Sequence, residues 1–267
     1  MPEGPEVRRI AQELAERVSG SVLQSIDILS GRYTKKLPSG LEAFRAQLPK
    51  KIVGAGCHGK FMYWILDDEC SIWSTLGMTG HWGQEDNSHA RVCFNLDDGK
   101  VYYSDQRNFG TLKFVRGKFS LIEKLTSLGP DMLATDVADK EFIKRVKTKP
   151  GWEITKVLMD QSIIAGVGNY IKADSLWLAK ISPHRKVCDI SDTELSVLNQ
   201  SIRKVMKESY ASGGATIRTY KSFSGEDGEY TQKFLVYNQK LDPDGNEVVR
   251  ELTADNRTTH WCPGVQV

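Results

Sequence analysis

The chain begins MPEGPEV, which places a proline and two carboxylates where their chemistry could be combined. Removal of the initiator methionine would leave the secondary amine of Pro2 as the N-terminus. Because an α-amine has a lower reference pKa than a lysine side chain, more of it is uncharged and nucleophilic at neutral pH. Its attack on a sugar aldehyde carbon would give a cationic iminium, which acidifies the neighbouring carbon and lets a phosphate leave. Glu3, the next residue, is placed to move protons on the same sugar.

A structural interpretation of the same residues stays open at this point. Proline and glutamate are favoured in the first turn of a helix, where a missing N–H costs nothing and carboxylates meet the positive end of the helix dipole. Apolar residues recur at helical spacing as far as Val18, and Ser19 and Gly20 end the pattern. The sequence therefore predicts an amphipathic helix with Pro2 just before its N-terminus.

The segment AGVGNYIKADSLW, residues 165–177, lies between two helical patterns and is a candidate phosphate site. Two glycines allow a tight turn that would expose backbone N–H groups at the start of a helix, and Asn169 adds a side-chain donor. An ordinary turn between helices would have the same composition. The segment alone does not decide between the two.

Two architectures follow one another along the chain. Residues 21–118 contain short β-prone runs separated by Gly, Asp and Asn turns, which predicts a sandwich or barrel. Residues 119–150 are typical of a linker leading into helix. Three helical patterns follow, the last opened by the capping box of Ser191 and Glu194. FLVYNQ, EVVREL and RTTHW then predict a small set of antiparallel strands.

Composition excludes some classes of protein and leaves others open. No apolar run approaches the roughly 20 residues that span a bilayer, and the start lacks a secretory signal. The five scattered cysteines contain no CxxC, so they predict neither a disulfide framework nor a zinc site. We therefore expect an intracellular protein, nuclear or cytoplasmic and monomeric. The net charge of +2 does not indicate a nucleic-acid partner, so any DNA-binding surface must come from the arrangement of charges.

Eight motifs cover essentially the whole chain. They are MPEGPEV at the N-terminus, GKF at 59–61, LGMTG at 76–80, DQRNFG at 105–110, LGPD at 128–131, LMDQSIIAGVGNYIKAD at 158–174, GGATIR at 213–218 and RTTHWCPGVQ at 257–266. With these motifs in this order, the sequence resembles the formamidopyrimidine-DNA glycosylase and endonuclease VIII family. The resemblance implies a bifunctional DNA glycosylase with AP-lyase activity that cleaves the strand by β,δ-elimination.

The resemblance also implies a role for particular residues. Pro2 matches the Schiff-base nucleophile, Glu3 the general acid/base and Glu6 a supporting carboxylate. Lys60 of GKF matches a lysine that contacts phosphate and assists elimination. Asn169, in the family's helix-two-turn-helix motif, matches a phosphate-binding asparagine, and Arg257 matches the arginine at the tip of the terminal hairpin. His89 is a further candidate for DNA phosphate.

A base cannot be excised from inside a duplex, so the damaged nucleotide must be flipped out and its place filled. In the family the filling residues come from the LGMTG and DxRxFG loops, which here implies Met78, Arg107 and Phe109. The alternative is that Met78 and Phe109 belong to the core. Their position in glycine-flanked loops, outside the alternating strands, favours the first interpretation.

Two features depart from the family pattern. Most members end in a zinc finger with two pairs of cysteines. In this sequence the first expected pair falls at DPDGN, which contains no cysteine, and only Cys262 remains of the second pair. One thiolate cannot hold a tetrahedral zinc, and adding His260 leaves the site incomplete. We therefore expect no metal or cofactor, and a hairpin like the zincless finger of some endonuclease VIII-like proteins. In DQRNFG, Asn108 replaces an arginine typical of the formamidopyrimidine branch.

Three functions stay open. MPEGPE and GNYIKADSLW resemble the endonuclease VIII branch, which favours oxidised pyrimidines and hydantoins as substrates. The motifs LGMTG and GGATIR leave the formamidopyrimidine branch open, in which the substrates would be 8-oxoguanine and formamidopyrimidines. A catalytically silent binder of damaged or abasic DNA would share the fold, and the presence of Pro2, Glu3 and Lys60 argues against it.

The motifs and patterns together predict an α+β protein with damaged DNA in the cleft between its main parts. Its expected divisions are an N-terminal helix with a catalytic β-sandwich at 1–130, a linker at 131–150, a helix-two-turn-helix domain at 151–224 and a zincless β-hairpin finger at 225–267.

Overall fold

The computed structural model describes residues 2–215, 223 and 228–267. Contacts divide the chain into two compact units, the first built around Glu6–Thr126 and the second around Ser127–Ser212 and Glu229–Val267. The short segment Glu3–Pro5 belongs to the second unit, although α1 (Gly4–Val18) continues from it into the first. The predicted first helix is therefore confirmed, and Pro2 precedes it.

An antiparallel sheet forms the body of the first unit, in the order β5-β7-β6-β1-β2-β3-β4-β8. Two four-stranded halves meet at a short pairing of β1 with β2, where Val22 lies opposite Lys51. The strands are β1 (Val22–Ile28), β2 (Lys50–His58), β3 (Phe61–Leu66), β4 (Cys70–Thr75), β5 (Gly80–Gly83), β6 (Ala90–Leu96), β7 (Gly99–Asp105) and β8 (Thr111–Arg116). The unit also contains η1 (Gly31–Thr34), α2 (Leu41–Arg45) and α3 (Ser120–Thr126).

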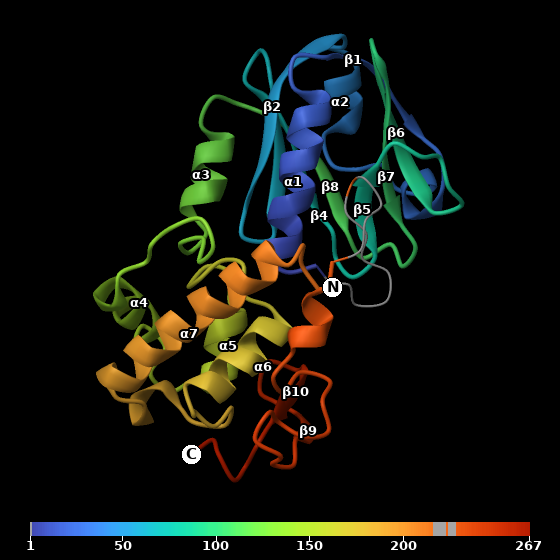
Figure 1. Cartoon of the computed structure of the whole chain (residues 1–267). Coiled ribbons are helices and arrows are strands. Elements are labelled where there is room, and N and C mark those ends of the chain that lie inside the picture. Colours follow the sequence, from blue (N-terminus) through green and yellow to red (C-terminus); the bar gives the residue numbers. More distant parts are fainter. Residues whose placement is uncertain (1, 216–222, 224–227) are drawn as a thin grey trace. The chain divides into compact units, whose positions relative to one another are not determined.

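Aromatic rings from both halves of the sheet meet in the core of this unit. The ring centroid of Trp64 on β3 lies 5.1 Å from that of Trp82 on β5 and 5.2 Å from that of Phe94 on β6. Helix α1 lies against the strands (Figure 1) and buries Ile10 and Leu14 in the same cluster. Burial of large apolar side chains between the two halves defines a β-sandwich, as predicted.

The sequence patterns did not predict β2, β5 or α2. Strand β2 reads KKIVGAGCH, and its two glycines interrupt the run of β-branched residues that usually indicates a strand. Its partner supplies the missing information, because β2 pairs with β3 from Ile52 opposite Leu66 to His58 opposite Phe61. Long-range pairing therefore decides the conformation of this segment.

Helices form most of the second unit. They are α4 (Asp139–Val146), α5 (Ile154–Met159), α6 (Asn169–Leu178) and α7 (Asp192–Ala211), with η2 (Val187–Asp189) and η3 (Tyr230–Lys233). The predicted capping box at the start of α7 is confirmed, with Ser191 and Glu194 each accepting from the other's backbone N–H. The structure differs at residues 131–150, expected to be a linker, because they contain α4 with Phe142 and Val146 fully buried.

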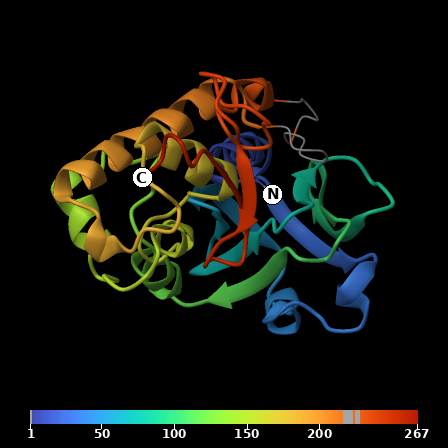
Figure 2. The same cartoon turned by 90° about the horizontal axis from the view of Figure 1, so that it is seen from below.

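A hairpin of β9 (Val249–Leu252) and β10 (Thr258–Trp261) lies beside α6 (Figures 1 and 2). The predicted strand FLVYNQ is wrong. Its backbone N–H groups at Leu235, Val236 and Tyr237 donate to the buried Asp174 carboxylate on α6 instead of to a neighbouring strand. One side chain therefore takes the donors that a strand would have needed.

The turn DPDGN folds around its first aspartate. Asp242 accepts hydrogen bonds from the backbone of Asp244 and Asn246 and from the Trp177 indole of α6, at 2.8–3.1 Å. Burial raises the pKa of its carboxyl, but the donors from Asn246, Trp177 and Cys262 outweigh burial and bring the pKa down to about 2. The charged form of Asp242 therefore stabilises this end of the chain.

We expect Asp242→Asn to lower the melting temperature by a few degrees at neutral pH. A carboxyl with a depressed pKa stabilises the fold above its unfolded pKa, near 3.8, and that contribution is lost as the pH falls toward about 2. Thermal unfolding of both proteins should give a constant difference from pH 7 to pH 5 and a shrinking one below pH 4. Asp244→Asn, in the same turn but exposed, is the control. A difference that grows below pH 4 would contradict this account.

Candidate active site

The carboxylate of Glu3 caps a helix that lies far away in the sequence. Its Oε1 accepts from the backbone N–H of Tyr170 at 3.0 Å, and its Oε2 accepts from that of Ile171 at 3.3 Å. The next residue, Gly4, donates its N–H to the carbonyl of Gly166 at 2.9 Å. Because a helix N-terminus attracts negative charge, α6 holds Glu3 in a defined place.

Gly168 allows this close approach. A Cβ at this position would lie 2.1 Å from Cδ of Glu3, which no side chain tolerates. The side chain of Glu3 is 2% exposed. Since Glu3 precedes α1 and caps α6, the structural interpretation of the N-terminal motif, as an ordinary first turn of its own helix, does not account for this residue.

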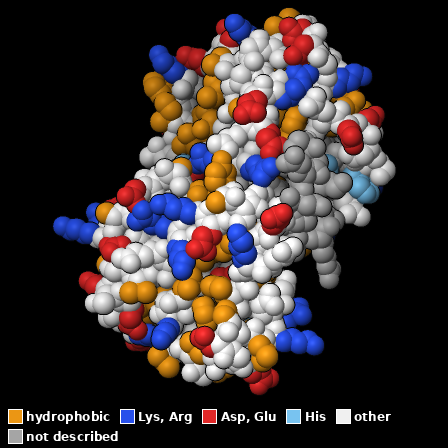
Figure 3. Space-filling model, in the orientation of Figure 1, with side chains coloured by type: hydrophobic (Ala, Val, Ile, Leu, Met, Phe, Trp, Pro, Cys, Tyr) orange, Lys and Arg blue, Asp and Glu red, His pale blue; other side chains and the backbone are white. Residues whose placement is uncertain are grey.

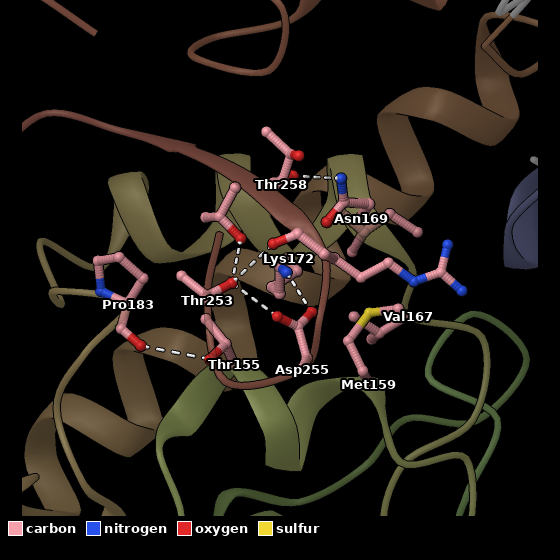
Figure 4. Close-up of polar contacts among 12 residues, drawn as sticks. Thr155, Met159, Val167, Asn169, Lys172, Pro183, Thr253, Asp255 and Thr258 are labelled. Atoms are coloured by element: carbon pink, nitrogen blue, oxygen red, sulfur yellow. Dashed lines mark hydrogen bonds and ion pairs between the residues drawn. The ribbon is translucent and has the colours of Figure 1, made fainter. Parts of the chain in front are cut away.

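Expectations for the phosphate site at the start of α6 need a correction. The sequence predicted free backbone N–H groups there, but those of Tyr170 and Ile171 donate to Glu3, and that of Lys172 donates to the carbonyl of Gly168. What the helix start can offer a phosphate is the side-chain amide of Asn169. Its Nδ2 donates to the carbonyl of Thr258 at 2.8 Å (Figure 4), and the same amide also hydrogen-bonds to the Tyr237 hydroxyl.

Arg257 lies in the turn that joins β9 to β10, next to Thr258, and is exposed. The backbone N–H of Thr253 donates to its carbonyl at 3.1 Å, and the hydroxyl oxygen of Thr253 lies 3.1 Å from the same carbonyl. Thr258, which accepts from Asn169, directly follows Arg257, and Thr253 donates to the carbonyl of Arg257. The backbone of Arg257 is therefore held from two directions. These two predicted phosphate ligands are brought together with Glu3 around the first turn of α6.

Glu6, in the first turn of α1, makes a different contact. Its Oε1 accepts from the backbone N–H of Ala215 at 2.8 Å, and a Cβ on Gly214 would lie 3.0 Å from its side chain. Gly214 has a φ of 88°, a conformation that favours glycine. Glu6 thus anchors the start of the GGATIR motif, whose residues 216–218 lie outside the described part of the chain.

The predicted void-filling residues form one exposed cluster in the first unit. A guanidinium nitrogen of Arg107 lies 3.0 Å from the sulfur of Met78, and the guanidinium carbon lies 4.7 Å from the ring centroid of Phe109. Met78 is 37% exposed and Phe109 is 56% exposed, so neither is a core residue.

The buried Asp105 and the exposed Arg32 hold the backbone of this cluster. Asp105, at the end of β7, accepts from the Thr79 hydroxyl at 2.6 Å and from the N–H of Gly110 at 2.7 Å. Arg32 donates to the carbonyls of Asn108 and Gly110. Asn108 has a φ of 56°, which asparagine adopts more readily than arginine. No motif in the sequence pointed to Arg32 as a support of this loop.

Lys60 and His89 lie on other turns of the first unit. Lys60 is in the tight turn between β2 and β3, directly after Gly59, whose φ is 58°. His89 is half-buried just before β6, and its carbonyl accepts from the N–H of Asp105. On the face drawn in Figure 3, basic and acidic side chains are interspersed. This distribution agrees with a net charge of +2.

Cys262 is not poised to bind a metal. Burial and the neighbouring Asp242 carboxylate raise the pKa of its thiol to about 12, so the thiol stays protonated at neutral pH and hydrogen-bonds to that carboxylate. In the described part of the chain no three His, Cys, Asp or Glu side chains gather as a metal site would require. None of the described helices is long and apolar enough to cross a membrane.

An α+β fold with a β-sandwich, a capped helix-two-turn-helix and a terminal hairpin is found in one class of DNA glycosylases. Family models match in the same order: the formamidopyrimidine-DNA glycosylase N-terminal domain at residues 1–112, its H2TH domain at 128–221 and its C-terminal domain at 226–267. The chain therefore belongs to the formamidopyrimidine-DNA glycosylase family, and the prediction of a DNA glycosylase with lyase activity is confirmed.

Individual relatives resemble the chain along its whole length. The formamidopyrimidine-DNA glycosylase of Streptococcus pneumoniae is 32% identical over 281 residues, which cover 100% of this chain and 99% of the relative. A variant of the Lactococcus lactis Fpg protein in complex with DNA containing Fapy-dG has a TM-score of 0.88 and 28% identity over 99% of both chains. The wild-type Lactococcus lactis protein in complex with DNA containing an oxidised pyrimidine has a TM-score of 0.86 and 27% identity, again over 99% of both chains.

We expect Gly168→Ala to reduce base excision at least about tenfold, a loss of about 1.4 kcal/mol of transition-state stabilisation. The new Cβ would displace the Glu3 carboxylate from the start of α6. Single-turnover excision of a damaged base measures the effect, and circular dichroism checks that the protein is folded. Gly151→Ala is the control, because a Cβ there meets nothing within 4 Å. A folded Gly168→Ala protein with the wild-type rate would show that the position of Glu3 does not matter.

Proposed function

We propose that this protein is a bifunctional glycosylase and AP lyase that removes oxidised bases from DNA through a Schiff base on Pro2. The observation that carries the proposal is the fixed carboxylate of Glu3, which α6 holds directly behind the N-terminal residue. A rigid acid next to a secondary amine provides the two groups that the chemistry requires. The partner is damaged DNA, as in the Lactococcus lactis complexes.

The reaction has a defined order of bond changes. The nitrogen of Pro2 attacks C1′ of the damaged nucleotide while the bond from C1′ to the base breaks, and the base leaves with that electron pair and takes up a proton from water. Glu3 accepts the amine proton of Pro2 and delivers it to the ring oxygen, which breaks the bond between C1′ and that oxygen and gives the iminium. The iminium acidifies C2′. Loss of a C2′ proton expels the 3′-phosphate, loss of a C4′ proton then expels the 5′-phosphate, and water hydrolyses the iminium to release the sugar fragment from Pro2. Glu6, whose carboxylate accepts from the backbone N–H of Ala215, is proposed as a supporting carboxylate.

Four residues are proposed to bind the phosphates of DNA. Asn169 and Arg257 are adjacent through Thr258 and would bind one phosphate, with the amide redirecting an N–H from the Tyr237 hydroxyl to the phosphate and the guanidinium fork donating two bonds. Lys60, in the turn between β2 and β3, would contact a second phosphate and assist its departure. His89 is proposed as a more peripheral phosphate contact.

Met78, Arg107 and Phe109 are proposed to fill the space that the flipped nucleotide leaves. Their exposure and mutual contacts support this role, because an exposed apolar cluster stacked with a guanidinium can insert between base pairs. The backbone under the cluster is held by Asp105 and Arg32. A preformed wedge needs little ordering when it enters the duplex.

Oxidised pyrimidines and hydantoins are the proposed substrates, as in the endonuclease VIII-like branch. The conformation of Asn108 supports this choice, because its side chain turns back toward the backbone N–H of Arg32, where the formamidopyrimidine branch has an arginine. Excision of 8-oxoguanine and formamidopyrimidines is the alternative, and the Fapy-dG complex of the Lactococcus lactis protein favours it. A catalytically silent binder is disfavoured because Pro2 and Glu3 are both in place.

A panel of four duplexes tests the proposal, containing thymine glycol, a hydantoin, 8-oxoguanine or an abasic site. We expect excision of the first two to exceed that of 8-oxoguanine, and abasic strands to end in phosphates on both sides of the gap, as β,δ-elimination requires.

Pro2→Gly, or an uncleaved tag before Pro2, should reduce strand cleavage at least about a hundredfold, in line with the loss of a nucleophile. A tagged protein that cleaves at the full rate would place the nucleophile elsewhere. Binding of damaged DNA without any cleavage would establish the silent binder.

A further inference from the structure

Lys172 is a fully buried lysine in the middle of α6. Its side chain is 0% exposed, and Nζ lies 2.5 Å from Oδ2 of Asp255, whose side chain is 2% exposed. Lysine is almost never fully buried unless it is paired, since removing a charge from water costs several kcal/mol. Burial lowers the pKa of the Lys172 amine, and the Asp255 carboxylate opposes that shift. Because burying this ion pair costs free energy, we look for a purpose in the positions that the two side chains hold.

Asp255 lies inside the turn that presents Arg257 (Figure 4). Its second carboxylate oxygen accepts from the hydroxyl of Thr253 at 2.6 Å. The same hydroxyl lies 3.1 Å from the carbonyl of Arg257 and 2.7 Å from the hydroxyl of Thr259. The ammonium of Lys172 is therefore linked to the backbone of Arg257 through two side chains.

A second link from α6 reaches the other side of the arginine. Asn169, one helical turn before Lys172, donates to the carbonyl of Thr258. Residues three apart on a helix lie on the same face, so both anchors come from one short stretch of α6. An isolated two-stranded hairpin is marginally stable in water, and β9 and β10 are four residues each. The turn at Arg257 thus depends on α6 for its place.

We propose that Lys172 and Asp255 are positioning residues that hold the Arg257 guanidinium beside the Asn169 amide, so that both bind the same DNA phosphate. This inference rests on the proposed function, because it assigns a purpose to the pair only if Arg257 binds phosphate. The pair does not touch the DNA. It fixes the spacing between two ligands that come from segments 88 residues apart, 169 and 257.

Binding to a duplex with a tetrahydrofuran abasic analogue tests the proposal without any chemistry. We expect Lys172→Met and Arg257→Ala each to weaken binding about tenfold at physiological salt, the loss typical of a charge-assisted hydrogen bond. The double variant should bind no more than about twofold more weakly than Lys172→Met alone, because an unanchored arginine has little left to lose. A role confined to general stability would instead leave the two losses independent.

Three further proteins complete the experiment. Asp255→Asn keeps the size of the side chain, is expected to fold, and should show the same non-additivity with Arg257→Ala. Lys147→Met is the matched control, because it removes an exposed ion pair with Asp192 in the same unit and should bind like the wild type. Circular dichroism of each variant checks the fold.

The outcomes separate the two proposals. Wild-type affinity in Lys172→Met, or a full tenfold loss on adding Arg257→Ala to either pair variant, would overturn the positioning role. A wild-type protein that neither binds the analogue nor cleaves any member of the lesion panel would overturn the proposed function itself.

Discussion

The capping of α6 by Glu3 is the interaction on which the site depends. Two backbone N–H groups at the start of a helix bind one carboxylate, and that carboxylate belongs to the third residue of the chain. The helix dipole and the donors stabilise the negative charge, while Gly168 leaves the space that the side chain occupies. An N-terminus is usually frayed. Here the hydrogen bonds of Glu3 to α6 hold the residue that directly follows Pro2.

Helix α6 is the common support of the segments around it. Along its ten residues, Asn169 and Lys172 hold the hairpin, Asp174 captures three backbone donors of residues 235–237, and Trp177 donates to Asp242. The helix is almost entirely buried, so hydrogen bonds offset the cost of burying most of these polar groups, although Oδ1 of Asn169 is buried without a hydrogen-bond partner. Hydrogen bonds and one ion pair thus connect α6 to the terminal hairpin and to the turns before it.

The sequence was sufficient where structure is local. Helix α1, the sandwich strands with clear alternation and the capping box at Ser191 follow from patterns a few residues long. It was insufficient where a distant partner decides: β2 is a strand because β3 pairs with it, and FLVYNQ is not one because Asp174 takes its donors. The ordered motifs indicated the family and supplied the candidate site residues, but Lys172 and Asp255, 83 residues apart, carry no signal in the sequence.

The central proposal is that the reactive group is the nitrogen of Pro2, freed by removal of Met1, next to the Glu3 carboxylate that α6 holds. Peptide mapping by mass spectrometry of the complex trapped with borohydride on DNA containing an oxidised pyrimidine tests it most directly. The account predicts one sugar adduct, on the nitrogen of Pro2 in the N-terminal peptide. An adduct on a lysine side chain instead, such as that of Lys60, would contradict it.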